Sequence, residues 1–98
     1  MATVQFKPLE DLSIHYKGKY VRFAGKFASK RTSYSNQNFV LQPGAVGFCY
    51  AASLGVLHVG FQSVKPGILP DKNAVNWANW PYHIGVSPFE ESCWEIES

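Results

Sequence analysis

The chain has 98 residues, of which 46% are hydrophobic, 15% aromatic and 16% charged, and its formal net charge is +2. This length fits one domain, and the low charged fraction with many aromatics excludes disordered, collagen-like and coiled-coil chains. Two cysteines are too few for a disulfide scaffold, and the longest apolar run is too short to span a membrane.

We therefore expect a single compact domain over residues 1–98, with no membrane partner. No basic start followed by an apolar stretch is found at Met1, so the sequence indicates no signal peptide. The two cysteines are accordingly expected to be reduced thiols in a cytoplasmic or other reducing intracellular compartment.

The first part of the chain predicts one short helix and one long strand. A short strand is expected over Thr3–Phe6, and a helix over residues 8–16, where the proline at 8 suits the first turn. Lys19–Ala28 alternates with a period of two, which is typical of a strand with one buried face. Its expected inner face consists of Val21, Phe23, Gly25 and Phe27, the glycine marking a bend. Its expected outer face consists of Tyr20, Arg22, Ala24 and Lys26.

The remaining elements are predicted from alternation and from Gly and Pro at the joints. Residues 29–38 are polar and predict a long hairpin loop, followed by a strand over Phe39–Gln42. Further strands are expected over Ala45–Ala52, Leu54–Val64, Tyr82–Val86 and Ser92–Ile96. The expected shared faces are Val46, Phe48 and Tyr50 in one strand and Leu57, Val59 and Phe61 in the next. Asp71 as a cap predicts a helix over residues 72–80, which Pro81 ends.

Five or six short strands with one or two short helices predict a mainly β domain, a small barrel of five to six strands. Gly18–Phe27, with its Gly-Lys-x-Val-Arg start and internal glycine, resembles the first strand of OB-folds, and Asn38–Leu41 resembles the strand that follows it. This resemblance implies an OB-like barrel in which the first hairpin forms part of a ligand groove. An SH3-like barrel accepts the same strand pattern, and both alternatives stay open.

Charge is distributed unevenly along the chain. No acidic residue lies between Leu12 and Pro70, a stretch with seven of the nine Lys and Arg residues, whereas residues 71–98 hold five of the seven acidic residues. A basic segment interleaved with aromatics is typical of proteins that bind single-stranded nucleic acid or another polyanion. The residues expected to bind it are Lys17, Lys19, Tyr20, Arg22, Lys26, Lys30, Arg31 and Tyr34. The alternative is that the acidic C-terminal segment pairs with this basic face inside the fold.

A second hypothesis is a protein-interaction or inhibitor module, as a small viral or phage accessory protein would be. Trp and Tyr are enriched as anchors of protein interfaces, and three of them lie close together near residue 80. The residues expected at this interface are Trp77, Asn79, Trp80 and Tyr82. The alternative is that Trp77 caps the end of the barrel and Trp80 packs beside Trp94. Self-association into a homo-oligomer also stays open.

The sequence contains residue types that bind metals or act in catalysis, but it lacks the patterns that either function needs. Zinc-ligand types are present as Cys49, His58, His83 and Cys93, but their spacing matches no known ligand pair. Either Cys49 or Ser53 could pair with His58 as nucleophile and base, yet residues 12–70 contain no acidic residue to orient the histidine. We expect no metal, no cofactor and no enzymatic activity.

Overall fold

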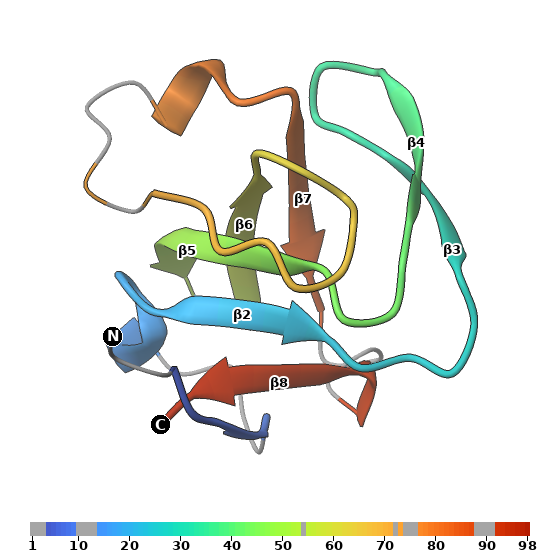
Figure 1. Cartoon of the computed structure of the whole chain (residues 1–98). Helices are drawn as coiled ribbons and strands as arrows, with labels where there is room; N and C mark the ends of the chain where they lie inside the picture. Colours follow the sequence, from blue (N-terminus) through green and yellow to red (C-terminus); the bar gives the residue numbers. More distant parts are fainter. Residues whose placement is uncertain (1–3, 10–13, 54, 72, 74–76, 88–91) are drawn as a thin grey trace.

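The computed structural model describes residues 4–9, 14–53, 55–71, 73, 77–87 and 92–98 (Figure 1). This part of the chain is mainly β, as predicted, and contains no α-helix. Its elements in chain order are β1 (Phe6–Pro8), the 3-10 helix η1 (Ile14–Tyr16), β2 (Tyr20–Phe23), β3 (Ser29–Thr32), β4 (Asn38–Leu41), β5 (Val46–Ser53), β6 (Val56–Phe61), the 3-10 helix η2 (Trp77–Asn79), β7 (Tyr82–Val86) and β8 (Trp94–Glu97).

Six strands form one antiparallel sheet in the order β1-β8-β2-β5-β6-β7, and β3 pairs with β4 in a separate hairpin. The sheet curls into a half-barrel that has β1 and β7 at its two ends (Figure 1). The tip of the β3–β4 hairpin reaches the outer edge of β7. There, the Tyr34 amide donates to the His83 carbonyl over 2.9 Å, and the His83 amide donates to Ser33 Oγ over 3.0 Å. The hairpin thus satisfies backbone groups of an end strand of the sheet.

The core lies on the inner face of the half-barrel. Val21 and Phe23 of β2 and the alternating apolar residues of β6 are buried there, as their strand phase predicts. The sequence predicts that Val46, Phe48 and Tyr50 form the core-facing side of β5, but they are not the residues that enter the core. The pattern is misleading because the first half of this strand is buried on both sides. Cys49 belongs to the core cluster, whereas Val46 and Phe48 lie on the opposite, outer face.

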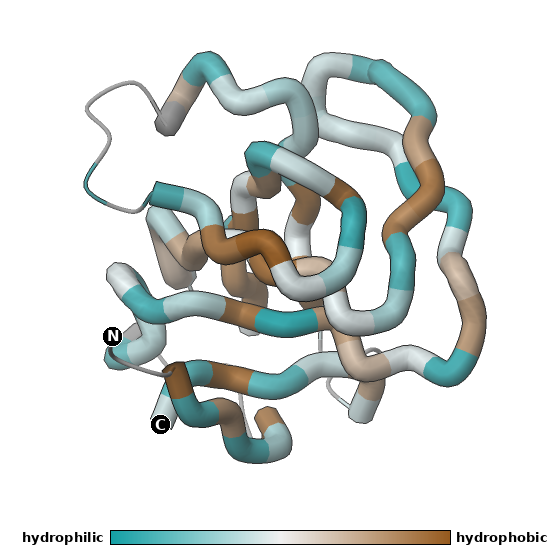
Figure 2. Tube along the Cα trace, in the orientation of Figure 1, coloured by the Kyte–Doolittle hydropathy of each residue, from teal (hydrophilic) through white to brown (hydrophobic). Residues whose placement is uncertain are grey.

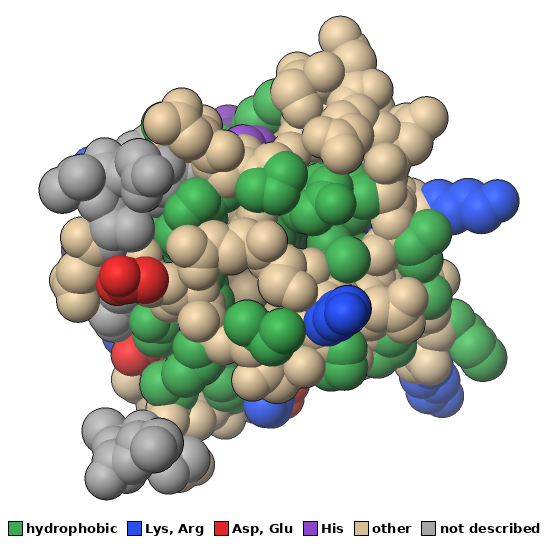
Figure 3. Space-filling view, turned by 45° about the horizontal axis from the view of Figure 1, so that its top comes forward, with side chains coloured by type: hydrophobic (Ala, Val, Ile, Leu, Met, Phe, Trp, Pro, Cys, Tyr) green, Lys and Arg blue, Asp and Glu red, His purple; other side chains and the backbone are tan. Residues whose placement is uncertain are grey.

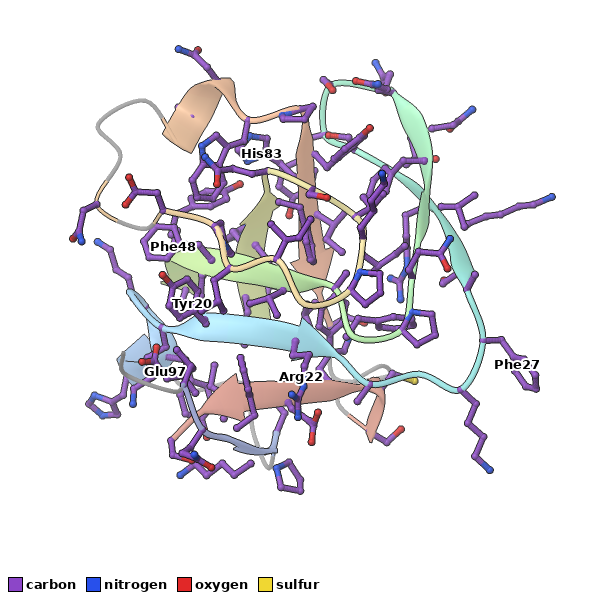
Figure 4. The ribbon with its side chains drawn as sticks, viewed as in Figure 1. Tyr20, Arg22, Phe27, Phe48, His83 and Glu97 are labelled. Atoms are coloured by element: carbon purple, nitrogen blue, oxygen red, sulfur yellow. The ribbon has the colours of Figure 1, made fainter. Side chains whose placement is uncertain are left out.

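Two segments cover that outer face: the chain that follows β6, and the segment that contains Trp80. The chain after β6 crosses in front of β5, and its apolar positions stand out in Figure 2. It is anchored where the Tyr20 hydroxyl donates to the Pro70 carbonyl over 2.8 Å. Trp80 is buried, and its ring meets Phe48 edge-on at 6.2 Å between centroids. Figure 4 shows Tyr20 and Phe48 side by side under this cover.

Several predicted boundaries are wrong. The first strand continues through Pro8, so the described start of the expected 8–16 helix is extended, and only η1 is helical; residues 10–13 lie outside the described residues. Likewise only η2 appears within the expected 72–80 helix, of which residues 72 and 74–76 are not described. The expected loop over residues 29–38 begins with a strand, β3.

The strand expected over Lys19–Ala28 ends at Phe23, which changes the position of Phe27. That side chain is 82% exposed instead of buried in the core. The physical reason is the turn that begins at Ala24, because beyond it the backbone no longer follows the alternation of β2. Gly25 lies directly above the Phe23 ring, and a Cβ there would collide with that ring.

Candidate functional site

The basic outer face of β2 is neutralised by β8. Arg22 and Glu95 are register partners, and Nη2 of the arginine lies 2.7 Å from Oε1 of the glutamate. The same guanidinium stacks over the Phe6 ring at 4.3 Å. Next to them, Glu97 accepts from the Tyr20 amide over 2.9 Å, and its carbonyl accepts from Lys19 Nζ over 3.5 Å. Glu95 of the acidic C-terminal segment therefore supplies the counter-charge for Arg22, and Glu97 adds hydrogen bonds at the start of β2.

The turn between β2 and β3 carries a different group of residues. Lys26, Phe27 and Lys30 are all exposed, and Figure 4 shows Phe27 pointing away from the ribbon. Within the described residues, neither lysine makes an ion pair. Lys and Arg side chains project on the hairpin side of Figure 3, whereas the larger acidic patch of that view lies on the opposite side. We call Lys26, Phe27 and Lys30 the basic turn.

Sequence reasoning missed Phe27 as an exposed aromatic, because regular alternation placed it in the core. The available signal was the glycine at 25, which marks a bend and so ends the alternation. An exposed phenylalanine that has an exposed lysine before it and another after it in the sequence offers an apolar ring face close to cations along the chain.

Arg31 and Lys17 differ from the basic turn. Arg31 is half-buried, donates from Nε to Ser29 Oγ over 3.0 Å, and lies 5.7 Å from the centroid of the Phe23 ring and 5.8 Å from that of Trp94. It therefore holds β3 against the core. Lys17 is exposed after η1, near the start of β2 rather than at the basic turn.

Tyr34 lies at the tip of the hairpin and is bound to a histidine of β6. Its hydroxyl is 2.8 Å from His58 Nδ1, and Ser53 Oγ is 3.5 Å from His58 Nε2. Desolvation by burial raises the pKa of Tyr34 above that of an ordinary phenol. Of the two pairs that the sequence leaves open, the structure thus brings Ser53 and His58 together, but with a neutral phenol in the place that a carboxylate takes in a catalytic triad.

Cys49 is separated from that pair. Its side chain belongs to the core and donates to the Ala51 carbonyl over 3.3 Å, whereas His58 lies on the outer face of β6. Desolvation raises the pKa of the Cys49 thiol to about 11, so it is protonated at neutral pH and is a poor nucleophile. Cys93 is half-buried, and neither cysteine forms a disulfide in the structure.

Two of the residues expected at a protein interface, Trp80 and Tyr82, pack against other aromatic rings of the fold. Trp80 is buried, and Tyr82 packs on Phe39 with 4.5 Å between ring centroids. Asn79 is exposed in η2, which begins at Trp77. Trp80 covers Phe48 rather than lying exposed for a partner.

Comparisons with known proteins do not identify a family or a function for the chain. No protein-family model, curated protein or solved structure matches the chain. In the described ranges, no three His, Cys, Asp or Glu side chains are grouped so that they could hold a metal ion. Nor does any helix among the described residues have the length and hydropathy needed to cross a membrane.

Proposed function

We propose that this protein is a non-enzymatic, cytoplasmic module that binds single-stranded nucleic acid through the basic turn. The observation that carries the proposal is the 82% exposed ring of Phe27 between the exposed Lys26 and Lys30. Single-strand binders combine cations that contact phosphates with aromatic rings on which bases stack. The exposed ring and the two exposed lysines all lie within residues 26–30, so one short segment carries both kinds of side chain.

The charge map supports the same ligand class. Residues 12–70 contain no acidic residue, so every loop and strand around the basic turn in sequence is neutral or cationic. The ion pair of Arg22 with Glu95 removes that arginine from the phosphate-binding set that the sequence suggests. The proposal therefore concentrates on Lys26, Phe27 and Lys30, with Arg31 as the residue that holds β3 in place.

Among the described residues no carboxylate is hydrogen-bonded to His58, and this supports the non-enzymatic part of the proposal. Ser53 Oγ lies 3.5 Å from the histidine, which is the outer limit of a hydrogen bond. The group on the other ring nitrogen is the Tyr34 hydroxyl, whose raised pKa keeps it neutral. A neutral phenol stabilises an imidazolium less than a carboxylate does.

For the fold family, we propose the SH3-like alternative over the OB-like one. Apart from the hairpin, consecutive strands β5, β6 and β7 are neighbours, and the last strand, β8, returns to pair with β2. This is an antiparallel meander closed by its final strand, whereas the OB-fold is a Greek-key barrel. The basic turn then lies at the start of the long excursion between the first two main strands.

A second candidate function is docking of a protein partner on an apolar groove beside that excursion. The groove lies between β1, the end of β2 and the segment after β6, and its lining includes Phe6, Pro43, Val46, Pro66 and Leu69. Ile68 and Leu69 are 44% and 45% exposed beside it. Exposed apolar residues that border a groove are a common feature of protein-docking sites.

The test of the main proposal compares two double variants that remove the same charge. Binding of a fluorescent oligothymidylate is measured by anisotropy against salt for wild type, Lys26→Ala/Lys30→Ala and Lys7→Ala/Lys65→Ala. On single strands each phosphate contact contributes about 0.7 to the slope of log affinity against log salt, so the basic-turn variant should lose about 1.4 of that slope. The control, whose two lysines are exposed on β1 and on the segment after β6, should keep its slope.

The same series separates the proposal from its rivals. Phe27→Ala should weaken binding without changing the slope, because stacking releases no counterions. Equal losses for the two double variants would show that only net charge matters and would contradict the assignment to the basic turn. Binding to vesicles that contain phosphatidylserine, with no binding to the oligonucleotide at low salt, would overturn the proposal in favour of an anionic membrane surface.

A further inference from the structure

A second set of rings lies on the outer face of β5, β6 and β7. Tyr50 meets His83 edge-on at 5.3 Å between centroids and lies 6.3 Å from His58, which lies 5.8 Å from Tyr34. All four rings are partly or largely exposed, and Tyr34 is 55% exposed. We call these four residues the aromatic–histidine face. They come from four separate segments of the chain, so no local sequence motif marks them.

Two glycines leave room for rings of this face to lie close to the sheet. A Cβ on Gly60 would lie 3.3 Å from the His83 ring, and a Cβ on Gly85 would lie 2.6 Å from the Tyr34 hydroxyl. Both glycines occupy outward positions of their strands, where any larger residue would push a ring away from the sheet. The rings of Tyr34 and His83 therefore lie close to the backbone of β6 and β7, and the four rings are tilted relative to one another.

The side chains of the aromatic–histidine face are suited to binding a ligand that contains uncharged heteroaromatic rings. Tyr and His are residues on which nucleobases stack, and their polar atoms hydrogen-bond with base edges. Desolvation raises the pKa of Tyr50, with further contributions from Tyr34 and Cys49, so its phenol stays neutral near pH 7. The strands β5 and β6 themselves contain no acidic residue.

We infer that the aromatic–histidine face is a nucleobase-stacking subsite for the same strand that the basic turn binds. The inference rests on the proposed function and extends its site from one ring to several. One hairpin joins the two places, since Phe27 of the basic turn precedes β3 and Tyr34 follows it. A strand that contacts Phe27 at one end of the hairpin can follow it to Tyr34, Tyr50 and His83 at the other.

The length of chain between the two places limits how far apart they can lie. Tyr34 lies seven positions after Phe27, and the four residues of β3 are extended. An extended chain rises about 3.3 Å per residue, so the two places are at most about 23 Å apart. A ligand within the roughly 4–16 nucleotides that small single-strand-binding barrels contact is therefore long enough to reach both places.

The test uses oligothymidylates of two lengths, about three and about twelve nucleotides, chosen to fall below and within the usual range of site sizes. Tyr50→Leu removes a ring but keeps apolar bulk, and Phe6→Leu is the matched control at the opposite end of the sheet. We expect Tyr50→Leu to weaken binding of the long oligonucleotide by roughly five- to a hundredfold, with its salt slope unchanged. Binding of the short oligonucleotide should stay at the wild-type level in both variants.

A second readout does not depend on the stability of any variant. An oligothymidylate with 5-iodouracil at a single position is cross-linked to wild type by light, and the modified peptide is identified by mass spectrometry. Cross-links to Tyr50, His58 or His83 from one end of the long ligand, with Phe27 reached from the other, are expected. Cross-links confined to the basic turn, with Tyr50→Leu equal to Phe6→Leu at both lengths, would overturn the subsite and leave the proposed function standing. If wild type binds neither length, the proposed function fails first and the subsite with it.

Discussion

Arg22 and Glu95 face each other across β2 and β8, with Nη2 and Oε1 2.7 Å apart. Residues 73 positions apart in the sequence thus cancel part of the charge asymmetry that dominates the composition. Because β8 is a central strand between β1 and β2, the acidic C-terminal segment cannot leave the basic face without opening the sheet. A carboxamide substitution is therefore the appropriate probe of its charge, rather than truncation.

Glu95→Gln should cost little stability and should improve polyanion binding. Both side chains of the pair are partly exposed, and such pairs contribute about 0.2–1 kcal/mol, less at high salt. The released Arg22 guanidinium can then contact a phosphate, which adds up to about 0.7 to the salt slope on single strands. Urea unfolding and oligonucleotide anisotropy measure the two effects. Unchanged binding would show that Arg22 lies outside the path of the ligand.

Phe23 and Phe27 have the same phase in the sequence but should respond oppositely to truncation. Phe23 is buried against Trp94 with ring centroids 5.2 Å apart, and removing such a ring from a core costs about 3–5 kcal/mol. Phe27 is exposed, and Phe27→Ala should change stability by less than about 0.5 kcal/mol. Thermal unfolding of the two variants compares them directly. A large loss for Phe27→Ala would mean that its ring is buried in solution.

Gly47→Ala and Gly85→Ala separate a backbone clash from a side-chain clash. At Gly47 a Cβ would lie 2.8 Å from the Gly60 carbonyl oxygen, which cannot move without shifting β6, so we expect a loss of about 1–3 kcal/mol or more. At Gly85 the nearest atom is the Tyr34 hydroxyl, at the end of a side chain that can rotate. Gly85→Ala should therefore unfold at nearly the wild-type urea concentration but break the Tyr34–His58 hydrogen bond. Nuclear magnetic resonance of the His58 ring reports that bond, and an unchanged ring signal would contradict the placement of Tyr34.

The two thiols should differ in reactivity. Cys49 is buried and desolvation raises its pKa to about 11, whereas Cys93 is half-buried in the turn before β8. Because the thiolate is the reactive form, native protein at neutral pH should label at Cys93 first and at Cys49 slowly. Unfolding should expose both thiols to Ellman's reagent. Two thiols that label equally fast in the native protein would show that the core opens readily at β5.

Stability should fall as the solution becomes alkaline, for the same physical reason. Burial raises the pKa values of Tyr34, Cys49 and Tyr50 in the folded state, so the unfolded chain releases these protons at lower pH. The contribution is constant below the ordinary pKa values and is lost as pH rises through the folded values, at about 1.4 kcal/mol per pH unit for each group. For Cys49 that interval lies between 9.0 and about 11. Urea unfolding between these limits should show a shallower loss for Cys49→Ala than for wild type.

The sequence by itself determined the mainly β class, the core phase of β2 and β6, and the uneven charge. These depend on alternation and composition, which act locally: Val21, Phe23, Leu57 and Val59 are buried because a strand with period two has one inner face. The turn beyond Phe23 was signalled only by Gly25, and there the alternation stops being informative.

Tertiary structure decided everything that depends on which strands become neighbours. The pairing of β8 with β2 brings Glu95 to Arg22, the cover over the outer face of β5 buries Phe48, and the hairpin tip brings Tyr34 to His58. Each of these contacts joins residues far apart in the chain, so no window of local sequence contains it. The same reason explains why the exposed ring of Phe27 and the aromatic–histidine face emerge only once the half-barrel is assembled.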